Sequence, residues 1–174
     1  MNIAIIPAKS NSVRIKNKNI KLFMGKPIIF WSIRSALNCK VFDKIIVSTD
    51  DKKIAKLVKK YGAEVPFIRP KKLADNKTEI LHVMKHAVKK ISKKNDKIKY
   101  ICCIFAAAPM IKYQNILKAF KVLKKRKCDF VFPVCENSDG IARSFFIKNK
   151  KINMLNKSFY HYRSQDLPKT YYDS

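Results

Sequence analysis

The sequence lacks the patterns that identify several common classes of protein. It has no apolar run long enough to span a membrane, and no basic stretch precedes the short apolar start at residues 1–7. Neither a transmembrane helix nor a signal peptide is therefore predicted, and the expected location is the cytoplasm. None of the five cysteines is spaced as CxxC, and no His, Cys or Asp cluster has metal-ligand spacing. We therefore predict neither a disulfide framework nor a zinc site.

Acidic residues are also scarce, with 12 Asp and Glu against 39 Lys and Arg, so the formal net charge is +27. Such a field promotes nonspecific binding to nucleic acid at low salt. The lysines, however, are spread over the polar sides of nearly every expected helix and do not gather with aromatic residues or arginine on one face. Specific binding to nucleic acid is therefore kept only as a minor alternative.

What the sequence does contain is an alternation of short apolar runs with longer segments of helical period. The runs that we expect to form strands are residues 2–7, 44–48, 64–67, 99–105 and 129–134. The segments that we expect to form helices are residues 27–39, 52–61, 78–91 and 113–125. Strands and helices alternating at this spacing predict an α/β, Rossmann-like fold, with a doubly wound, mostly parallel sheet flanked by helices.

Several finer features can be predicted within this alternation. The uninterrupted apolar run at 99–105 predicts a central strand that is covered on both faces. Gly62 is expected to end the second helix, and Thr78 is expected to cap the third. His86 falls beside the apolar stripe of that third helix and is interpreted as a packed residue. Residues 145–155 predict a hairpin with a polar turn near Asn149.

Ligands of doubly wound sheets bind beyond the carboxyl ends of the strands, which directs attention to residues 8–19. This segment is polar, basic and free of glycine, so it is neither GxxxxGK[ST] nor GxGxxG. Its N–H groups, serine hydroxyls and cationic side chains suit phosphate oxygens. From the residues alone, a phosphate-binding loop and an ordinary surface loop are equally open. Asp50 and Asp51, after the second strand, could face the same site or cap the helix that follows.

The stretch IPAKSNSVRIKNKNIKLFMGKPII resembles the opening signature of the CMP-sugar acid synthetases, the acylneuraminate cytidylyltransferase family. The likeness continues in order through IIVSTDDKKIAKLVKKYGAEVPFIRPKKLADNKT, YICCIFAAAP and YRSQDLPKTYYDS, and it covers essentially the whole chain. The paired cysteines, the FIRP-x-x-LAD stretch and the RSQDLP segment most resemble pseudaminic acid cytidylyltransferases. An ordered series of motifs is far more specific than any single motif.

The resemblance implies a nucleotidyltransferase of the nucleotide-diphospho-sugar transferase type. Such an enzyme transfers CMP from CTP to a nonulosonic acid, an acidic nine-carbon sugar, and releases pyrophosphate. Pseudaminic acid is the first expectation for the substrate, with sialic or legionaminic acid next. The resemblance also implies Mg²⁺ as cofactor and a homodimer. Two rivals stay open: a truncated, inactive nucleotide-binding remnant, and a basic nucleic-acid-binding protein.

The resemblance also implies roles for individual residues. Arg14 and Lys18 are implied to be catalytic, and Arg163 and Gln165 to bind the sugar acid. The implied nucleotide-binding set is Ala8, Lys9, Ser12, Arg14, Lys18, Asn19, Arg69, Asp75 and Ala107. The chain departs from the family pattern at Lys9, where arginine is usual, and at Val13, where lysine is usual. Alanines at 106–108 replace the polar residues of the family's QPTSP-type loop.

By the same resemblance, residues 1–174 are expected to be a single nucleotidyltransferase domain, with 144–174 as a hairpin, substrate and dimerisation region. In the family, the aspartates that contact the metal lie in a segment C-terminal to the last matched stretch. This sequence ends at Ser174 before such a segment. We therefore expect a C-terminally incomplete fold and predict no metal ligand within the chain.

Overall fold

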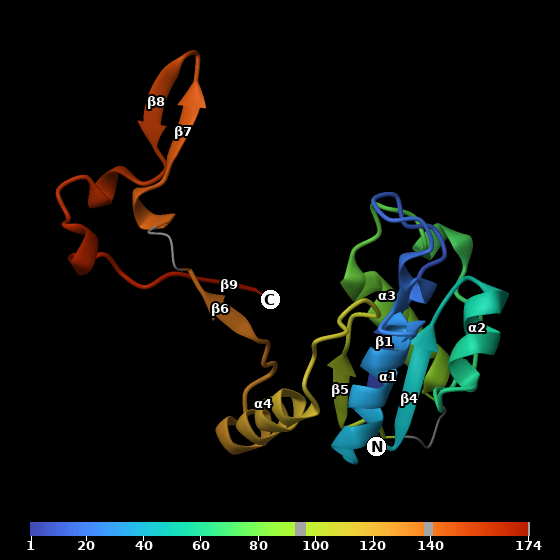
Figure 1. Cartoon of the computed structure of the whole chain (residues 1–174). Helices are drawn as coiled ribbons and strands as arrows, with labels where there is room; N and C mark the ends of the chain where they lie inside the picture. The colour runs from blue at the N-terminus through green and yellow to red at the C-terminus, as the bar shows by residue number, and fades with distance from the viewer. Residues whose placement is uncertain (93–96, 138–140, 174) are drawn as a thin grey trace. The chain divides into compact units, whose positions relative to one another are not determined.

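A computed structural model describes residues 1–92, 97–137 and 141–173, and its fold is drawn in Figure 1. The chain forms two compact units, Met1–Lys118 and Ala119–Ser174, and each is described by itself. The strands of the first unit are β1 (Asn2–Pro7), β2 (Leu22–Phe23), β3 (Lys26–Pro27), β4 (Lys44–Ser48) and β5 (Tyr100–Cys103). Its helices are α1 (Ile28–Cys39), α2 (Lys52–Lys59), α3 (Ile80–Ile91) and the start of α4 (Tyr113–Arg126).

The first unit is built on a three-stranded sheet with the order β4-β1-β5. β1 pairs in parallel with β4 from Ile3, opposite Lys44, onwards, and in parallel with β5 from Asn2, opposite Tyr100, onwards. Parallel neighbours need long crossover connections, which the helices of this unit supply. The predicted α/β fold with a parallel sheet flanked by helices is confirmed, and β1 and β4 have the predicted bounds.

The strand predicted at residues 64–67 is not continuous. Glu64 makes a single parallel bridge to Ile46, and Ile68 makes another to Thr49. Pro66 lies between the two bridges and has no N–H to donate, so the ladder is interrupted there.

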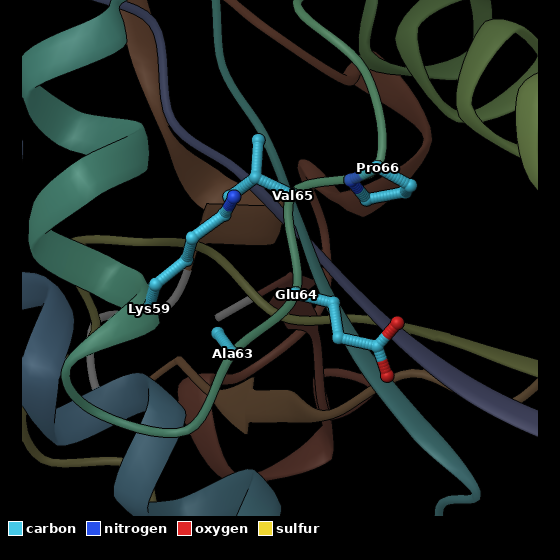
Figure 2. A pocket seen from close by; sticks show the side chains of 5 residues that line it. All are labelled: Lys59, Ala63, Glu64, Val65 and Pro66. Atoms are coloured by element: carbon cyan, nitrogen blue, oxygen red, sulfur yellow. The ribbon is translucent and has the colours of Figure 1, made fainter.

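An open hollow of about 290 Å³ lies beside this segment at the end of α2, as Figure 2 shows.

The position of β5 in the sheet also differs from the prediction. Within the described residues β5 pairs with β1 alone, and its Ile101 is 43% exposed. The central position belongs to β1, where residues 3–6 have no exposed surface. The prediction of a covered central strand at 99–105 is therefore wrong. An uninterrupted apolar run indicates an apolar strand but does not fix its place in the sheet.

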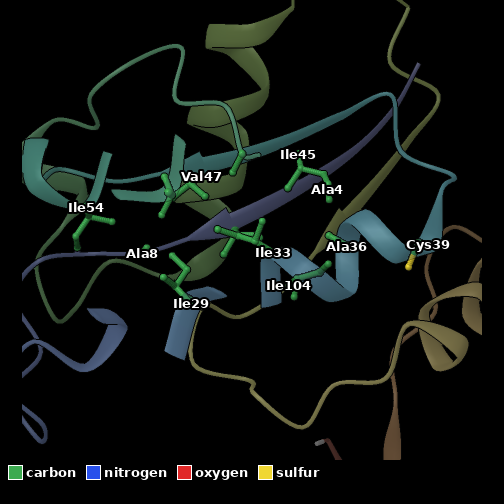
Figure 3. Close-up of a cluster of buried hydrophobic side chains, with 14 of the residues drawn as sticks. Ala4, Ala8, Ile29, Ile33, Ala36, Cys39, Ile45, Val47, Ile54 and Ile104 are labelled. Carbon is green, nitrogen blue, oxygen red and sulfur yellow. The ribbon is translucent and has the colours of Figure 1, made fainter. Parts of the chain in front are cut away.

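Helices pack on both faces of the sheet, because alternate residues of each strand point to opposite sides. On one face, Ala4 and Ile6 of β1 belong to a cluster that also contains residues of α1 and α2. Figure 3 shows this cluster, in which Ile29, Ile33 and Ala36 of α1 lie against the sheet. On the other face, Ile3 and Ile5 pack with residues of α3. The sheet is therefore doubly covered, as predicted.

The ends of the helices confirm one prediction and correct another. Gly62 follows α2 with φ of 87°, a left-handed conformation that glycine adopts at little cost. Thr78 does not cap α3, which begins only at Ile80; the Thr78 hydroxyl donates to the carbonyl of Lys72 at 3.3 Å.

None of the described helices combines the length and apolar character needed to cross a lipid bilayer.

The second unit contains two antiparallel strand pairs. β6 (Val134–Glu136) pairs with β9 (Tyr171–Asp173), and β7 (Phe145–Lys148) pairs with β8 (Lys151–Met154). The predicted hairpin is confirmed, and its turn residues Asn149 and Lys150 have φ of 52° and 59°, as a type I′ turn requires. The strand predicted at 129–134 is found only from Val134, because Pro133 cannot donate to a ladder. The single-domain interpretation, with 144–174 as substrate and dimerisation region, stays a prediction.

His86 is packed within the first unit, and this packing predicts a dependence of stability on pH. Its ring meets Phe67 edge to face at 5.2 Å between centroids, and both ring nitrogens are buried without a hydrogen-bond partner among the described residues. Burial, followed by the charges of Lys90, Arg69 and Lys72, lowers the pKa of His86 below its usual value. The unfolded chain therefore binds this proton more readily, and His86 reduces the stability of the folded state as the pH falls through about 6.5.

We expect the free energy of unfolding to fall between pH 7.5 and pH 5.5, and to fall less in His86→Leu than in the parent protein. Urea unfolding at the two pH values measures the effect. His82→Leu is the matched control, because His82 lies on the same helix with an exposed side chain. An identical pH dependence of stability in the parent and in His86→Leu would show that His86 does not cause the loss of stability at low pH.

Candidate functional site

β1 leads directly into residues 8–19, the basic loop, at the carboxyl edge of the sheet (Figure 1). Ala8 is fully buried and donates its N–H to the carbonyl of Ser48 at 2.9 Å, which continues the pairing with β4 past the strand. Ser10 donates its N–H to Asp50 Oδ1 at 2.9 Å and its hydroxyl to Asp50 Oδ2. The basic loop therefore starts from a fixed position beside the end of β4.

The far end of the basic loop is also fixed. Asn19 is buried and donates its Nδ2 to the carbonyl of Lys9 at 2.8 Å, which closes the loop on itself. Asn19 lies in a short 3-10 helix, Lys18–Ile20, that begins after Asn17 in the left-handed conformation. The loop is thus held at both ends without a glycine.

The middle of the basic loop presents cationic side chains that are not engaged. Arg14 and Lys16 are exposed and Lys18 is half-buried. Within the described part of the chain, none of the three has an ion pair or a side-chain hydrogen bond. Ser12 is half-buried, and Val13 is 73% exposed. Arg14 and Lys18 are therefore compatible with the predicted binding of an anion, since no carboxylate of the described ranges pairs with them.

Lys9 connects the basic loop to the segment before α3. Its Nζ donates to the carbonyl of Asp75 at 3.0 Å and to Asn76 Oδ1 at 2.7 Å. The Asp75 carboxylate in turn accepts from the N–H groups of Thr78 and Lys77, which order that segment. The hydrogen bonds from Thr78 lower the pKa of Asp75 most, and the charge of Lys9 adds to the effect. The structure thus brings together two residues predicted to bind the nucleotide, Lys9 and Asp75.

Arg69 is placed differently from a residue that contacts a ligand directly. Its side chain is only 2% exposed, and its guanidinium lies 3.6 Å from Asp50 Oδ1. Its backbone N–H donates to the carbonyl of Thr49 at 2.8 Å, while Nε and one terminal nitrogen are buried and find no hydrogen-bond partner in the described part of the chain. Burial lowers the pKa of Arg69 from its ordinary value, and Asp50 opposes this change. Direct contact of Arg69 with a nucleotide stays a prediction.

The structure separates the two neighbouring aspartates that the sequence left undecided. Asp51 caps α2, because its Oδ1 accepts from the N–H groups of Lys53 and Ile54. Asp50 does not cap the helix and faces Ser10 instead. Burial acts to raise the pKa of Asp50, but the hydrogen bonds from Ser10 and the charge of Arg69 hold the pKa below its usual value.

The alanine loop at residues 105–109 is positioned by α1. The Ser32 hydroxyl is buried and donates to the carbonyl of Phe105 at 2.9 Å, with a second contact to the carbonyl of Ala106 at 3.3 Å. Ser35, one turn later, donates to the carbonyl of Ile111 at 2.7 Å. Ala107 itself is half-buried. The loop has no polar side chain before Pro109, so only its backbone groups can recognise a ligand.

Arg163 and Gln165 lie in the second unit. Arg163 donates its Nε to Asp166 Oδ2 at 2.7 Å in an exposed local contact, and Gln165 is exposed. The structure gives each residue a place in its own unit only, so their predicted role in binding the sugar acid stays a prediction.

The residues described in this chain do not fit a bound Mg²⁺. Three aspartates, Asp50, Asp51 and Asp75, lie near the carboxyl edge, and each is already engaged by the hydrogen bonds described above. Over the described ranges, no group of three or more acidic, histidine or cysteine side chains could hold a metal ion. The requirement for Mg²⁺ therefore stays a prediction, and none of the described residues is assigned as a metal ligand.

Sequence comparison identifies proteins that are related to this chain. The family model for cytidylyltransferases matches residues 3–171. The pseudaminic acid cytidylyltransferase of Campylobacter jejuni subsp. jejuni serotype O:2 is 36% identical over 174 residues, which cover 99% of this chain and 75% of that protein. The CMP-N,N'-diacetyllegionaminic acid synthase of Legionella pneumophila is 32% identical over 70% of this chain and 53% of that protein.

Comparison with solved structures supports the fold alone, because the identities are low. A CMP:2-keto-3-deoxy-manno-octonic acid synthetase complexed with CTP has a TM-score of 0.62 at 19% identity, over 76% of this chain and 50% of that one. A cytidylyltransferase from Leptospira borgpetersenii has a TM-score of 0.59 at 17% identity, over 87% of this chain and 58% of that one.

Proposed function

Because this chain belongs to the cytidylyltransferase family, we propose that it transfers CMP from CTP to a nonulosonic acid and releases pyrophosphate. Pseudaminic acid is the first candidate, since the Campylobacter relative named for it is 36% identical over 99% of the chain. Sialic and legionaminic acids follow, on the evidence of more distant relatives. The homodimer remains a prediction from the resemblance, and the cytoplasmic location remains a prediction from the sequence, in which no signal peptide or membrane-spanning run is found.

The observation that carries the proposal is the basic loop, which is fixed at both ends and presents, at the carboxyl edge of the sheet, cations without an ion-pair partner among the described residues. A triphosphate at this edge would meet Arg14, Lys18 and the loop N–H groups. Arginine offers a bidentate fork to phosphate oxygens, whereas lysine offers a mobile point charge. Nucleotidyl transfer depends mainly on such positioning and neutralisation of charge.

In the proposed reaction the anomeric hydroxyl of the sugar acid attacks the α-phosphorus of CTP. The new oxygen–phosphorus bond forms as the bond to the oxygen bridging the α- and β-phosphates breaks, the hydroxyl proton passes to solvent, and pyrophosphate leaves. Arg14 and Lys18 stabilise the negative charge that develops on the departing pyrophosphate. Recognition of the sugar acid by Arg163 and Gln165 stays a prediction from the resemblance, since an arginine suits a carboxylate.

An assay of pyrophosphate release from CTP with a panel of sugar acids tests the proposal, with Mg²⁺ in the buffer and the CMP-sugar identified by mass. We expect turnover with pseudaminic acid and much less with ATP, GTP or UTP. CTP binding without turnover on any acid would favour the inactive remnant. Nucleic-acid binding that survives high salt, with no turnover, would favour the basic binding protein.

A further inference from the structure

The anchor of the basic loop is an anion, although the loop is proposed to bind one. Asp50 accepts both the N–H and the hydroxyl of Ser10, and its side chain is only 10% exposed. An unpaired carboxylate beside a triphosphate would repel it, and this repulsion is strong where solvent is excluded. The arrangement therefore needs a positive charge close to Asp50.

Arg69 supplies that charge from the interior. Its guanidinium lies 3.6 Å from Asp50, on a side chain that is almost completely buried. Asp50 is the one carboxylate that pairs with Arg69 among the described residues. The pair is close to neutral overall, so it can hold the basic loop without opposing an anionic ligand.

Resting on the proposed function, we propose that Asp50 and Arg69 are positioning residues for CTP. Arg69 neutralises and orients the Asp50 carboxylate, and Asp50 fixes Ser10 so that the N–H groups of the basic loop meet the triphosphate. We call this series of contacts, from Arg69 through Asp50 to Ser10, the relay. This role differs from the direct nucleotide contact expected for Arg69 and acts on the ligand through the loop.

The neighbouring aspartates provide a matched pair of variants. Asp50→Ala is expected to weaken CTP binding about tenfold and to raise KM for CTP by a similar factor, because the loop loses its anchor. Asp51→Ala removes the cap of α2 and is expected to lower the unfolding midpoint while leaving CTP affinity unchanged. Asp50→Asn keeps the side-chain volume and one acceptor oxygen, and serves if Asp50→Ala does not fold.

Arg69→Met tests the second half of the relay. It leaves Asp50 as an unpaired buried anion, so CTP affinity is expected to fall more than tenfold. Adding Asp50→Asn to this variant removes the unpaired charge, and we expect part of the affinity to return. If Arg69 has a purely structural role, the second substitution is expected to lower the CTP affinity further.

Titration calorimetry with CTP, together with amide exchange of residues 9–14 in the ligand-free protein, distinguishes the outcomes. Faster exchange and weaker binding in Asp50→Ala, but not in Asp51→Ala, support the relay. A parent chain that binds no CTP overturns the proposed function and, with it, the role of the relay. A parent that binds CTP, with Asp50 variants that bind equally well, overturns the relay alone.

Discussion

Replacing both Arg14 and Lys18 with alanine is expected to weaken CTP binding about a thousandfold, and each single replacement about 10- to 100-fold. A hydrogen bond to a charged group contributes about 1.5–3 kcal/mol, and about 1.4 kcal/mol corresponds to a factor of ten. Both side chains lack an ion-pair partner within the described residues, so little stability should be lost with them. Titration calorimetry measures the affinity, and Arg14→Lys should lie between the parent and Arg14→Ala because it keeps the charge and loses the fork.

Lys21→Ala is the control for this prediction. Lys21 is exposed just beyond the basic loop, so its replacement removes the same charge from a chain with a net charge of +27. If Lys21→Ala weakens CTP binding as much as Lys18→Ala, the effect is one of overall field. A double variant that binds CTP like the parent would show that the triphosphate lies elsewhere.

The second large effect is expected in the core beneath the site. Ile33 of α1 has no exposed surface and belongs to the cluster shown in Figure 3. Ile33→Ala is expected to lower the free energy of unfolding by about 3 kcal/mol, because it removes buried methyl groups and leaves a cavity. Domains of this kind are stable by only about 5–15 kcal/mol, so this is a large share of the total.

Urea unfolding followed by the fluorescence of Trp31 measures this loss. Trp31 is the single tryptophan and lies on α1 itself, where its Nε1 donates to the carbonyl of Phe23 at 3.0 Å. Leu37→Ala is the control, since Leu37 lies one turn after Ile33 and is 44% exposed. We expect its cost to be below about 1 kcal/mol. Equal losses in the two variants would contradict the assignment of Ile33 to the core.

The sequence predicted those parts of the fold that depend on local pattern. The bounds of β1, β4 and α1 follow from apolar runs and from Pro27 at a helix start, and these signals lie within a few residues of each other. The place of β5 in the sheet depends on which strands meet from distant parts of the chain. The run at 99–105 contains no information about its neighbours, so its exposed edge could not be predicted.

Within the site, too, the features that depend on contacts between distant residues could not be predicted from the sequence. Asp50 and Asp51 are chemically identical and adjacent, yet one anchors the basic loop and the other caps α2. The extended backbone of Asp51, with φ of −112° and ψ of 122°, places it as the cap and leaves Asp50 directed to Ser10. Ser10 lies in the predicted loop, but its pairing with Asp50 is not visible in the sequence because the two residues are 40 positions apart. The basic character of the loop, by contrast, is visible in the residues themselves.

The strand order β4-β1-β5 also determines when the sheet can be completed on a ribosome. The middle strand is the first to be synthesised, and it can pair with β4 as soon as residue 48 has emerged. Its other edge must wait for β5, which ends at residue 103. At roughly 5–20 residues per second this delay is about 3–11 s. During that time the nascent chain carries an unpaired strand edge of isoleucine and alanine, and such an edge can pair with another chain until β5 covers it.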